Sequence, residues 1–461
     1  MTFAATSVIA RARNAFPSGR TPSAFAGING ARDWPGSATA GRTTALNKMA
    51  TSFVSPPPRT SPEVSPQQEQ REREFSPLPR GEVLRPRYTV DGSDALEDQL
   101  HSSCELVRNA VLQRLLPGNI EGLLLGGGYG RGEGGVLQTS DGEQPYNDLE
   151  FYVFVRGSRH AFEFRYRDTF ERLSHELSPA VGLEVEFKIM SLEELRRTPI
   201  SMFFYDMIAG HKWLIGSDDL LRGCEHHRAA RLLPLAEATR LLMNRCTGLL
   251  FAREHLGVEP FEDENADFIR RNIRKAQLAF GDAILAAFGR YHWSCRARHE
   301  RLEKLTVALP WRSALLEHHG RGVDFKLHPF KSEETRDELA GEFNDVIAFA
   351  GDLWLWLESK RLHHSFISAR HYATNTMPKW PESKRTRNVL HNLKLFRRPM
   401  LWGAFRHPRE RVLESLAVLL WEPVALTDSA LRTLLELNLR AKMPDRATAV
   451  RRYATVWSRV S

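Results

Sequence analysis

The segment from Leu123 to Val155 places the strongest constraint on the fold. Two apolar runs, LLL and LEFYVFV, lie on either side of a stretch in which six of the nine residues from Gly126 to Gly134 are glycine. Apolar runs of this length, bounded by turn residues, are typical of buried strands. Glycine permits tight turns and lets the backbone approach a ligand closely. The pattern predicts two strands joined by a loop whose N–H groups can turn toward an anion.

The residues around this segment predict a small α/β unit. Apolar residues recur every three or four positions over 94–116, which indicates an amphipathic helix that Pro117 and Gly118 end. Strands are expected at 120–125, 149–155 and 182–190. Residues 158–177 have the length and pattern of a helix, with Ser158 as its N-cap. The expected order is helix, strand, glycine loop, strand, helix, strand.

Carboxylates alternate with apolar residues on two of these strands. Asp148 and Glu150 share one strand face, since side chains two positions apart point to the same side. Glu184 and Glu186 repeat this spacing on the next strand. Neighbouring carboxylates repel each other unless a cation lies between them, and hard oxygen ligands suit Mg²⁺ or Mn²⁺. We therefore expect a divalent-cation site, and the Arg131 side chain can pair with a triphosphate near the glycines.

These two motifs resemble those of a known superfamily. The stretch GGYGRGEG, followed by NDLEF, is similar to the signature of the DNA polymerase beta type nucleotidyltransferases. The resemblance implies that Gly127 and Gly128 bind the nucleotide and that Asp148 and Glu150 are metal ligands. It makes Glu186 the third carboxylate, with Glu184 as the alternative. The sequence departs from the pattern in having Gly128 where serine is common, Asn147 before the first acid, and a longer polar insertion.

The resemblance implies an enzyme with a small mixed-sheet nucleotidyltransferase core followed by a mostly α-helical domain. Such an enzyme uses Mg²⁺ or Mn²⁺ to transfer a nucleoside monophosphate from a nucleoside triphosphate to an acceptor hydroxyl, releasing pyrophosphate. Asp148, Glu150 and Glu186 are then the catalytic residues. The acceptor, whether small molecule, RNA or protein, is not indicated by any motif. The alternative is a catalytically decayed nucleotide-binding or RNA-interaction protein.

Composition divides the chain into three parts, with expected bounds 1–90, 91–225 and 226–461. The first part is rich in proline, serine and threonine, which predicts a disordered extension. Its arginines and scarcity of acidic residues also resemble a transit peptide, and Met49 is an alternative start. The second part is the expected catalytic domain, and the third is the expected helical domain.

The third part adds further candidates for contact with anions. Lys275 and Asp282 lie seven residues apart on one face of an expected helix, where Lys275 could touch a phosphate. The basic stretch from Lys379 to Arg398 makes nucleic-acid contact an option, although a solvated surface is the favoured interpretation. The net charge of +8 is too modest to demand such a partner.

Composition also bears on the compartment. The four cysteines lie far apart in the chain, without the spacing of a zinc site or a disulfide framework, which favours a reducing, cytoplasmic compartment. We expect no membrane partner, because no apolar run approaches the roughly 20 residues that cross a bilayer.

Overall fold

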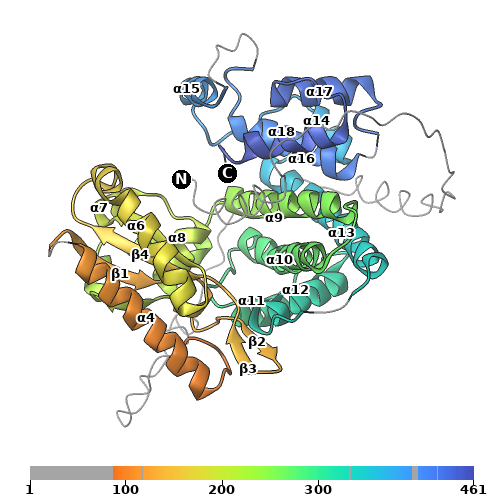
Figure 1. Ribbon diagram of the computed structural model, residues 1–461. Helices are drawn as coiled ribbons and strands as arrows, with labels where there is room; N and C mark the ends of the chain where they lie inside the picture. Colours follow the sequence, from red (N-terminus) through yellow and green to blue (C-terminus); the bar gives the residue numbers. More distant parts are fainter. Residues whose placement is uncertain (1–86, 116–117, 332–333, 397–402, 423, 461) are drawn as a thin grey trace, which may run out of the picture. The chain divides into compact units, whose positions relative to one another are not determined.

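The computed structural model describes residues 87–461 except 116–117, 332–333, 397–402, 423 and 461. The expected N-terminal extension lies outside the described residues as far as residue 86, as do Pro117, Arg397 and Arg398. Residues 87–461 belong to one compact unit (Figure 1).

A mixed four-stranded sheet forms the centre of the first part of this unit, in the order β5-β4-β1-β6. Strands β4 and β5 run parallel, and β1 is antiparallel to both β4 and β6. The strands are β1 (Ile120–Leu125), β4 (Leu149–Val155), β5 (Val185–Ser191) and β6 (Lys212–Ile215). The predicted combination of a small mixed sheet with helices is therefore confirmed.

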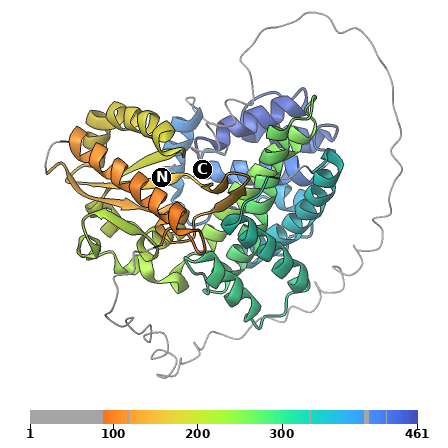
Figure 2. The same ribbon diagram turned by 60° about the horizontal axis from the view of Figure 1, so that its bottom comes forward.

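Helices cover both faces of this sheet. Helix α4 (Asp94–Arg114) and helix α6 (Arg159–Val181) lie side by side over one face, as Figures 1 and 2 show. The alternating strand residues Leu123, Leu125, Phe151 and Val153 are buried against them. The intervening Leu124, Tyr152 and Phe154 face α7 (Leu192–Arg197) and α8 (Met202–Ala209). Burial on both faces explains why the central strands are continuous apolar runs rather than alternating ones.

Local capping explains where several of these helices begin. The Ser158 hydroxyl accepts a hydrogen bond from the Ala161 N–H, so the predicted N-cap of α6 is confirmed. Ser93 caps α4 in the same way through the Leu96 N–H. Helix α6 ends at Gly182, whose φ of 70° is the left-handed conformation that glycine adopts readily.

The glycine segment, residues 126–134, contains regular secondary structure rather than a simple loop. It contains the short helix α5 (Gly127–Gly130), and the polar insertion forms a hairpin of β2 (Val136–Thr139) and β3 (Gly142–Pro145). The expectation of an irregular loop was therefore wrong. Glycine disfavours helices intrinsically, so only the surrounding contacts stabilise α5, and a sequence pattern does not show them.

The regular secondary structure in the described residues of the second part is helical. Its longest helices, α9, α10 and α13, contribute to one large apolar core. The described 3-10 turns are η1 (Asp218–Leu221), η2 (Glu225–Arg228) and η3 (Ala230–Leu232), and the helices are α9 (Leu235–Leu256), α10 (Asp263–Ala287), α11 (Cys295–Glu303), α12 (Arg312–Leu327), α13 (Arg336–Leu362), α14 (Ala369–Thr374), α15 (Arg385–Phe396), α16 (Pro408–Trp421), α17 (Ser429–Leu439) and α18 (Arg446–Trp457). Among the helices of the described ranges, none is both long enough and apolar enough to cross a bilayer.

In the basic stretch near α15, the described Lys384, Arg385, Arg387 and Lys394 are exposed, as the favoured solvated surface requires, whereas Lys379 differs. Lys379 is fully buried, where its ammonium donates to the carbonyl oxygens of Asn375 and Met377. Trp380 is also buried. The acidic Glu414, 3.7 Å from the Lys379 ammonium, offsets the charge. Lys379 and Trp380 thus belong to the protein interior and are not accessible to a nucleic acid.

Candidate functional site

The parallel pairing of β4 with β5 places two of the predicted carboxylates side by side. Glu150 lies directly opposite Glu186 in the strand register. Glu184 precedes β5 and is exposed, and its carbonyl oxygen accepts the Leu149 N–H. Asp148 lies one residue before β4, whose observed bounds are the expected ones. The structure therefore groups Glu186, rather than Glu184, with Glu150.

A lysine that the sequence reasoning missed lies between these carboxylates. The Lys188 ammonium is 2.7 Å from Oε2 of Glu150 and 3.2 Å from Oε2 of Glu186. The Tyr152 hydroxyl donates a second hydrogen bond, of 2.8 Å, to the same oxygen of Glu150. Although burial opposes it, the charges of Glu150 and Glu186 raise the pKa of Lys188 to about 12. Lys188 is therefore positively charged at neutral pH, and its ammonium lies between the carboxylates of Glu150 and Glu186.

The electrostatics of Asp148 show that the three carboxylates interact. Burial, together with the charges of Glu150 and Glu186, raises the pKa of Asp148 to about 6, while Lys188 and Lys275 oppose the rise. A nearby divalent cation would reverse this shift, and carboxylate oxygens are suitable ligands for Mg²⁺ or Mn²⁺. Nevertheless, in the described ranges no three acidic, histidine or cysteine side chains already converge on a metal position. The donor chemistry fits a hard cation, but Lys188 lies among the donors.

The glycine segment approaches the carboxylates closely. The Gly126 N–H donates to the backbone oxygen of Glu150, which ties the segment to β4. Gly127 has a φ of 62°, and a Cβ atom added there would lie 3.1 Å from Oε1 of Glu150. Both the conformation and the contact require glycine at this position. The first N–H groups of α5, including those of Gly127 and Gly128, have no acceptor within the helix, as at any helix start.

Two buried side chains fix the shape of the glycine segment. The Tyr129 hydroxyl donates to the Gly135 carbonyl and accepts from the Tyr146 N–H. Lys212 on β6 donates to the carbonyl oxygens of Tyr129 and Gly130, where α5 ends. Burial lowers the pKa of Lys212 to about 8. The segment is thus held from both sides and presents its glycines at a defined place.

Arg131 points toward α8. Its guanidinium is 4.0 Å from the Asp206 carboxylate. Burial opposes ionisation of Glu150, but Lys188 and Tyr152, with a smaller effect of Arg131, hold its pKa below the ordinary value. Burial raises the pKa of Asp206 to about 6, against the effect of Arg131. The Nε atom of Arg131 is buried and has no hydrogen-bond acceptor among the residues that the structure describes. Arg131 is therefore near the carboxylate group, but it is oriented by Asp206.

Glu133 joins the glycine segment to the helical part. Its carboxylate accepts hydrogen bonds from the Ser294 hydroxyl, at 2.6 Å, and from the Cys295 N–H, at 2.8 Å. These groups start α11, where a negative charge is favourable. Burial opposes ionisation of Glu133, but the two hydrogen bonds and the charges of Lys326 and Arg298 hold its pKa below the ordinary value.

Lys326, near the end of α12, lies close to Gly128, the residue where the resemblance leads one to expect a serine. Its ammonium is 3.4 Å from the place of a Cβ atom on Gly128. Burial, reinforced by the charge of Arg131, lowers the pKa of Lys326. Within the part of the chain that the structure describes, this ammonium makes no hydrogen bond and no ion pair. The acidic residue whose charge acts on this partly buried ammonium is Glu133.

Lys275 was predicted to contact a phosphate. It is exposed on α10, and its charge acts on Asp148. Asp282, seven residues later, is buried and pairs instead with Arg298, at 3.1 Å, and with His319, at 3.2 Å. Lys275 and Asp282 therefore do not form a common surface along α10.

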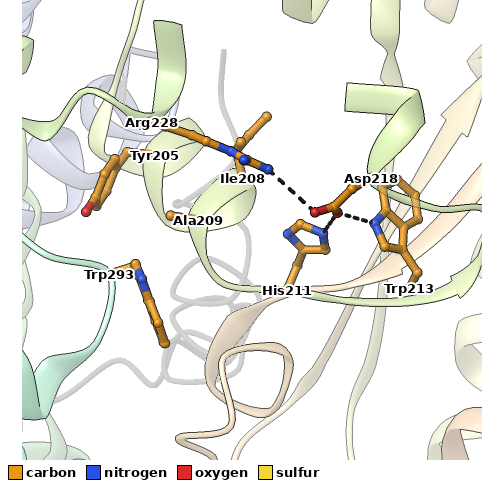
Figure 3. A pocket seen from close by; sticks show the side chains of 8 residues that line it. All are labelled: Tyr205, Ile208, Ala209, His211, Trp213, Asp218, Arg228 and Trp293. Atoms are coloured by element: carbon orange, nitrogen blue, oxygen red, sulfur yellow. Dashed lines mark hydrogen bonds and ion pairs between the residues drawn. The ribbon is translucent and has the colours of Figure 1, made fainter. Parts of the chain in front are cut away.

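Two cavities lie among residues near the glycine segment and α8. One, of about 370 Å³, is lined by Arg131, Gly132, Glu133 and the start of α11. Another, of about 490 Å³, is shown in Figure 3 between α8 and β6, and none of the three carboxylates lines it. Its acidic residue, Asp218, is held by three neighbours, His211, Trp213 and Arg228. The walls of this cavity combine these polar groups with the aromatic rings of Tyr205 and Trp293.

Comparison of the chain with models of known protein families, with curated protein sequences and with solved structures finds no match.

Proposed function

We propose that this protein is a nucleotidyltransferase that transfers a nucleoside monophosphate from a nucleoside triphosphate to an acceptor hydroxyl. The observation that supports this proposal is that the carboxylates of β4 and β5 lie next to the glycine segment, which has the Lys326 ammonium nearby. Gly127 leaves no room for a Cβ atom beside Glu150, which lies opposite Glu186, and the ammonium of Lys326 lies near Gly128. A metal–triphosphate complex needs both kinds of surface next to each other.

Each side chain has a role in this proposal. Asp148, Glu150 and Glu186 would hold Mg²⁺ or Mn²⁺, which would supply charge neutralisation at the phosphates and lower the pKa of the acceptor hydroxyl. The N–H groups of Gly127 and Gly128 would donate to phosphate oxygens. Lys326 would pair with the triphosphate in place of the serine hydroxyl that Gly128 lacks.

Arg131 and Lys275 complete the proposed charge pattern. Arg131 is held by Asp206 within the electrostatic range of Glu150, so it would stabilise negative charge without a large movement. Lys275 acts on Asp148 from α10 and would reach the phosphates from the opposite side. No acceptor-specific feature distinguishes a small molecule, an RNA or a protein.

The alternative is a nucleotide-binding protein whose transferase chemistry has decayed. The observation that favours it is the Lys188 ammonium between Glu150 and Glu186, since a cation fixed there would make a divalent ion unnecessary. This alternative keeps nucleotide binding but removes transfer.

The deciding experiment incubates the protein with each α-labelled nucleoside triphosphate, Mg²⁺ and a cell extract, and follows label transfer to an acceptor. The double variant Asp148→Asn, Glu150→Gln keeps the side-chain shapes while removing two charges, so we expect it to lose transfer. Undiminished transfer in this variant would exclude the assigned active site. Nucleotide binding without transfer by the unmodified protein would favour the decayed alternative.

The glycine segment is tested separately through Lys326. Lys326→Met removes the ammonium but keeps the aliphatic stem, and we expect nucleoside triphosphate affinity to fall about 10-fold or more, as for loss of one charged hydrogen bond. Lys442→Met is the matched control, since Lys442 is an exposed lysine paired with Glu436 far along the chain. Equal affinities of the two variants by calorimetry would remove Lys326 from the site.

A further inference from the structure

The ammonium of Lys188 lies where a cation bound by the carboxylates would have to be. Lys188 follows Glu186 by two residues on β5, so both side chains point to the same face of the sheet. From there Lys188 reaches across to β4 and contacts Oε2 of Glu150 at 2.7 Å and Oε2 of Glu186 at 3.2 Å. Its side chain is only 13% exposed, so water does not screen these contacts strongly.

A divalent cation would use the same oxygen atoms. Oε2 of Glu150 already accepts hydrogen bonds from Lys188 and from the Tyr152 hydroxyl, which leaves little room for a further electrophile. A metal and an ammonium within about 4 Å of each other would also repel strongly at the low effective dielectric of a buried site. The two cations therefore cannot share the position between Glu150 and Glu186.

We propose that Lys188 is an internal competitor of the divalent cation, so that a metal binds only when it displaces the Lys188 ammonium from Glu150 and Glu186. The inference rests on the proposed function, because it takes these carboxylates to be the metal site. The competition makes the free protein a weak metal binder, and the chelating oxygens of a bound triphosphate add the ligands that favour displacement.

The neighbourhood provides a place for the displaced ammonium. The Lys188 Nζ atom lies 5.5 Å from the centre of the Tyr152 ring, whose face attracts cations. The flexible lysine stem can move the ammonium over this ring without a change in the strand. Lys188 thereby stays near the site after displacement, and it returns when the metal leaves.

The test is a titration with Mn²⁺ in the absence of nucleotide, in which the free ion is measured by electron paramagnetic resonance. Lys188→Met keeps the length of the side chain but removes the competing charge, and we expect Mn²⁺ to bind about 10-fold more tightly than to the unmodified protein. Lys188→Arg keeps a cation in place and should leave the affinity within about two-fold. Lys442→Met removes one charge from a remote exposed site and should have no effect.

The outcomes separate the competition from the transfer activity. An unchanged Mn²⁺ affinity of Lys188→Met would overturn the inference, as would a gain that Lys442→Met shares. Adding Glu186→Gln to Lys188→Met should abolish the gain, and a gain that survives would also overturn it. If Lys188→Met does not fold, Lys188→Gln tests the same expectation. Tighter Mn²⁺ binding by Lys188→Met, together with no label transfer by the unmodified protein, would support the competition while refuting the proposed transferase.

Discussion

Replacement of Glu133 tests how the glycine segment is held. Glu133→Ala removes the acceptor for the Ser294 hydroxyl and for the buried Cys295 N–H. Hydrogen bonds to a charged group contribute about 1.5–3 kcal/mol each, and such neighbouring losses are not additive. We therefore expect the free energy of unfolding to fall by about 3 kcal/mol. Glu133→Gln keeps one carbonyl acceptor and should lose about half as much.

The assay is urea-induced unfolding followed by circular dichroism, with Glu300→Gln as the control. Glu300 is an exposed glutamate on the same helix, α11, so its replacement removes an equal charge without the buried hydrogen bonds. We expect that control to change the free energy of unfolding by less than about 0.5 kcal/mol. A loss for Glu133→Ala no larger than that of the control would refute the anchoring role.

The pH dependence of the free energy of unfolding independently tests whether Glu133 is ionised in the folded protein. The folded pKa of Glu133 is lowered from 4.5, so ionisation stabilises the fold. This stability is present above the unfolded pKa and is lost as the pH falls through the folded value. The difference in unfolding free energy between the unmodified protein and Glu133→Gln should therefore be constant from pH 6 to pH 8 and shrink below about pH 4.5. A difference that grew on acidification would contradict the assigned charge state.

Three further predictions concern the carboxylates and the glycines. Glu186→Gln should lower single-turnover transfer about 100-fold under saturating Mg²⁺, and Glu184→Gln much less, since only Glu186 lies opposite Glu150; the reverse ranking would move the third-ligand role to Glu184. Without metal, Asp148→Asn should be more stable than the unmodified protein at pH 7. The raised pKa of Asp148, about 6, means that its stability contribution is present below pH 3.8 and lost as the pH rises through 6; equal urea midpoints at pH 7 would contradict this. Gly127→Ala should cost about 1–2 kcal/mol, because its φ of 62° is left-handed, and an unchanged melting temperature would show that the segment adapts.

The strands were predictable because their signals are local. The observed bounds of β1 and β4 match the two apolar runs, which glycine and polar residues delimit sharply. The helix after β4 begins where Ser158 indicated. These features need only neighbouring residues, so periodicity and capping preferences are sufficient to place them.

The contacts that the sequence did not predict have one reason in common, which is that they join residues far apart in the chain or on different strands. Lys326 reaches Gly128 from a helix almost 200 residues later in the chain, and Glu133 meets Ser294 across a similar separation. No periodicity links such pairs, and only the tertiary fold shows that they meet. Lys188 was visible on the predicted strand, but its contact with Glu150 depends on the parallel register of β4 and β5. Similarly, the burial of Lys379 depends on Glu414, 35 residues away in sequence.

The anchoring of the glycine segment by α11 and α12 has a consequence for dissecting the protein. The sequence suggested that catalytic and helical domains meet near residue 225, which would invite expression of the first alone. Such a fragment would lack Ser294, Cys295 and Lys326, and Glu133 would be left without the hydrogen-bond donors that it has in the whole chain. The carboxylates would remain on their strands, but the nucleotide side of the site would be incomplete. A loss of nucleotide binding in that fragment would therefore say nothing about whether the first domain carries the chemistry.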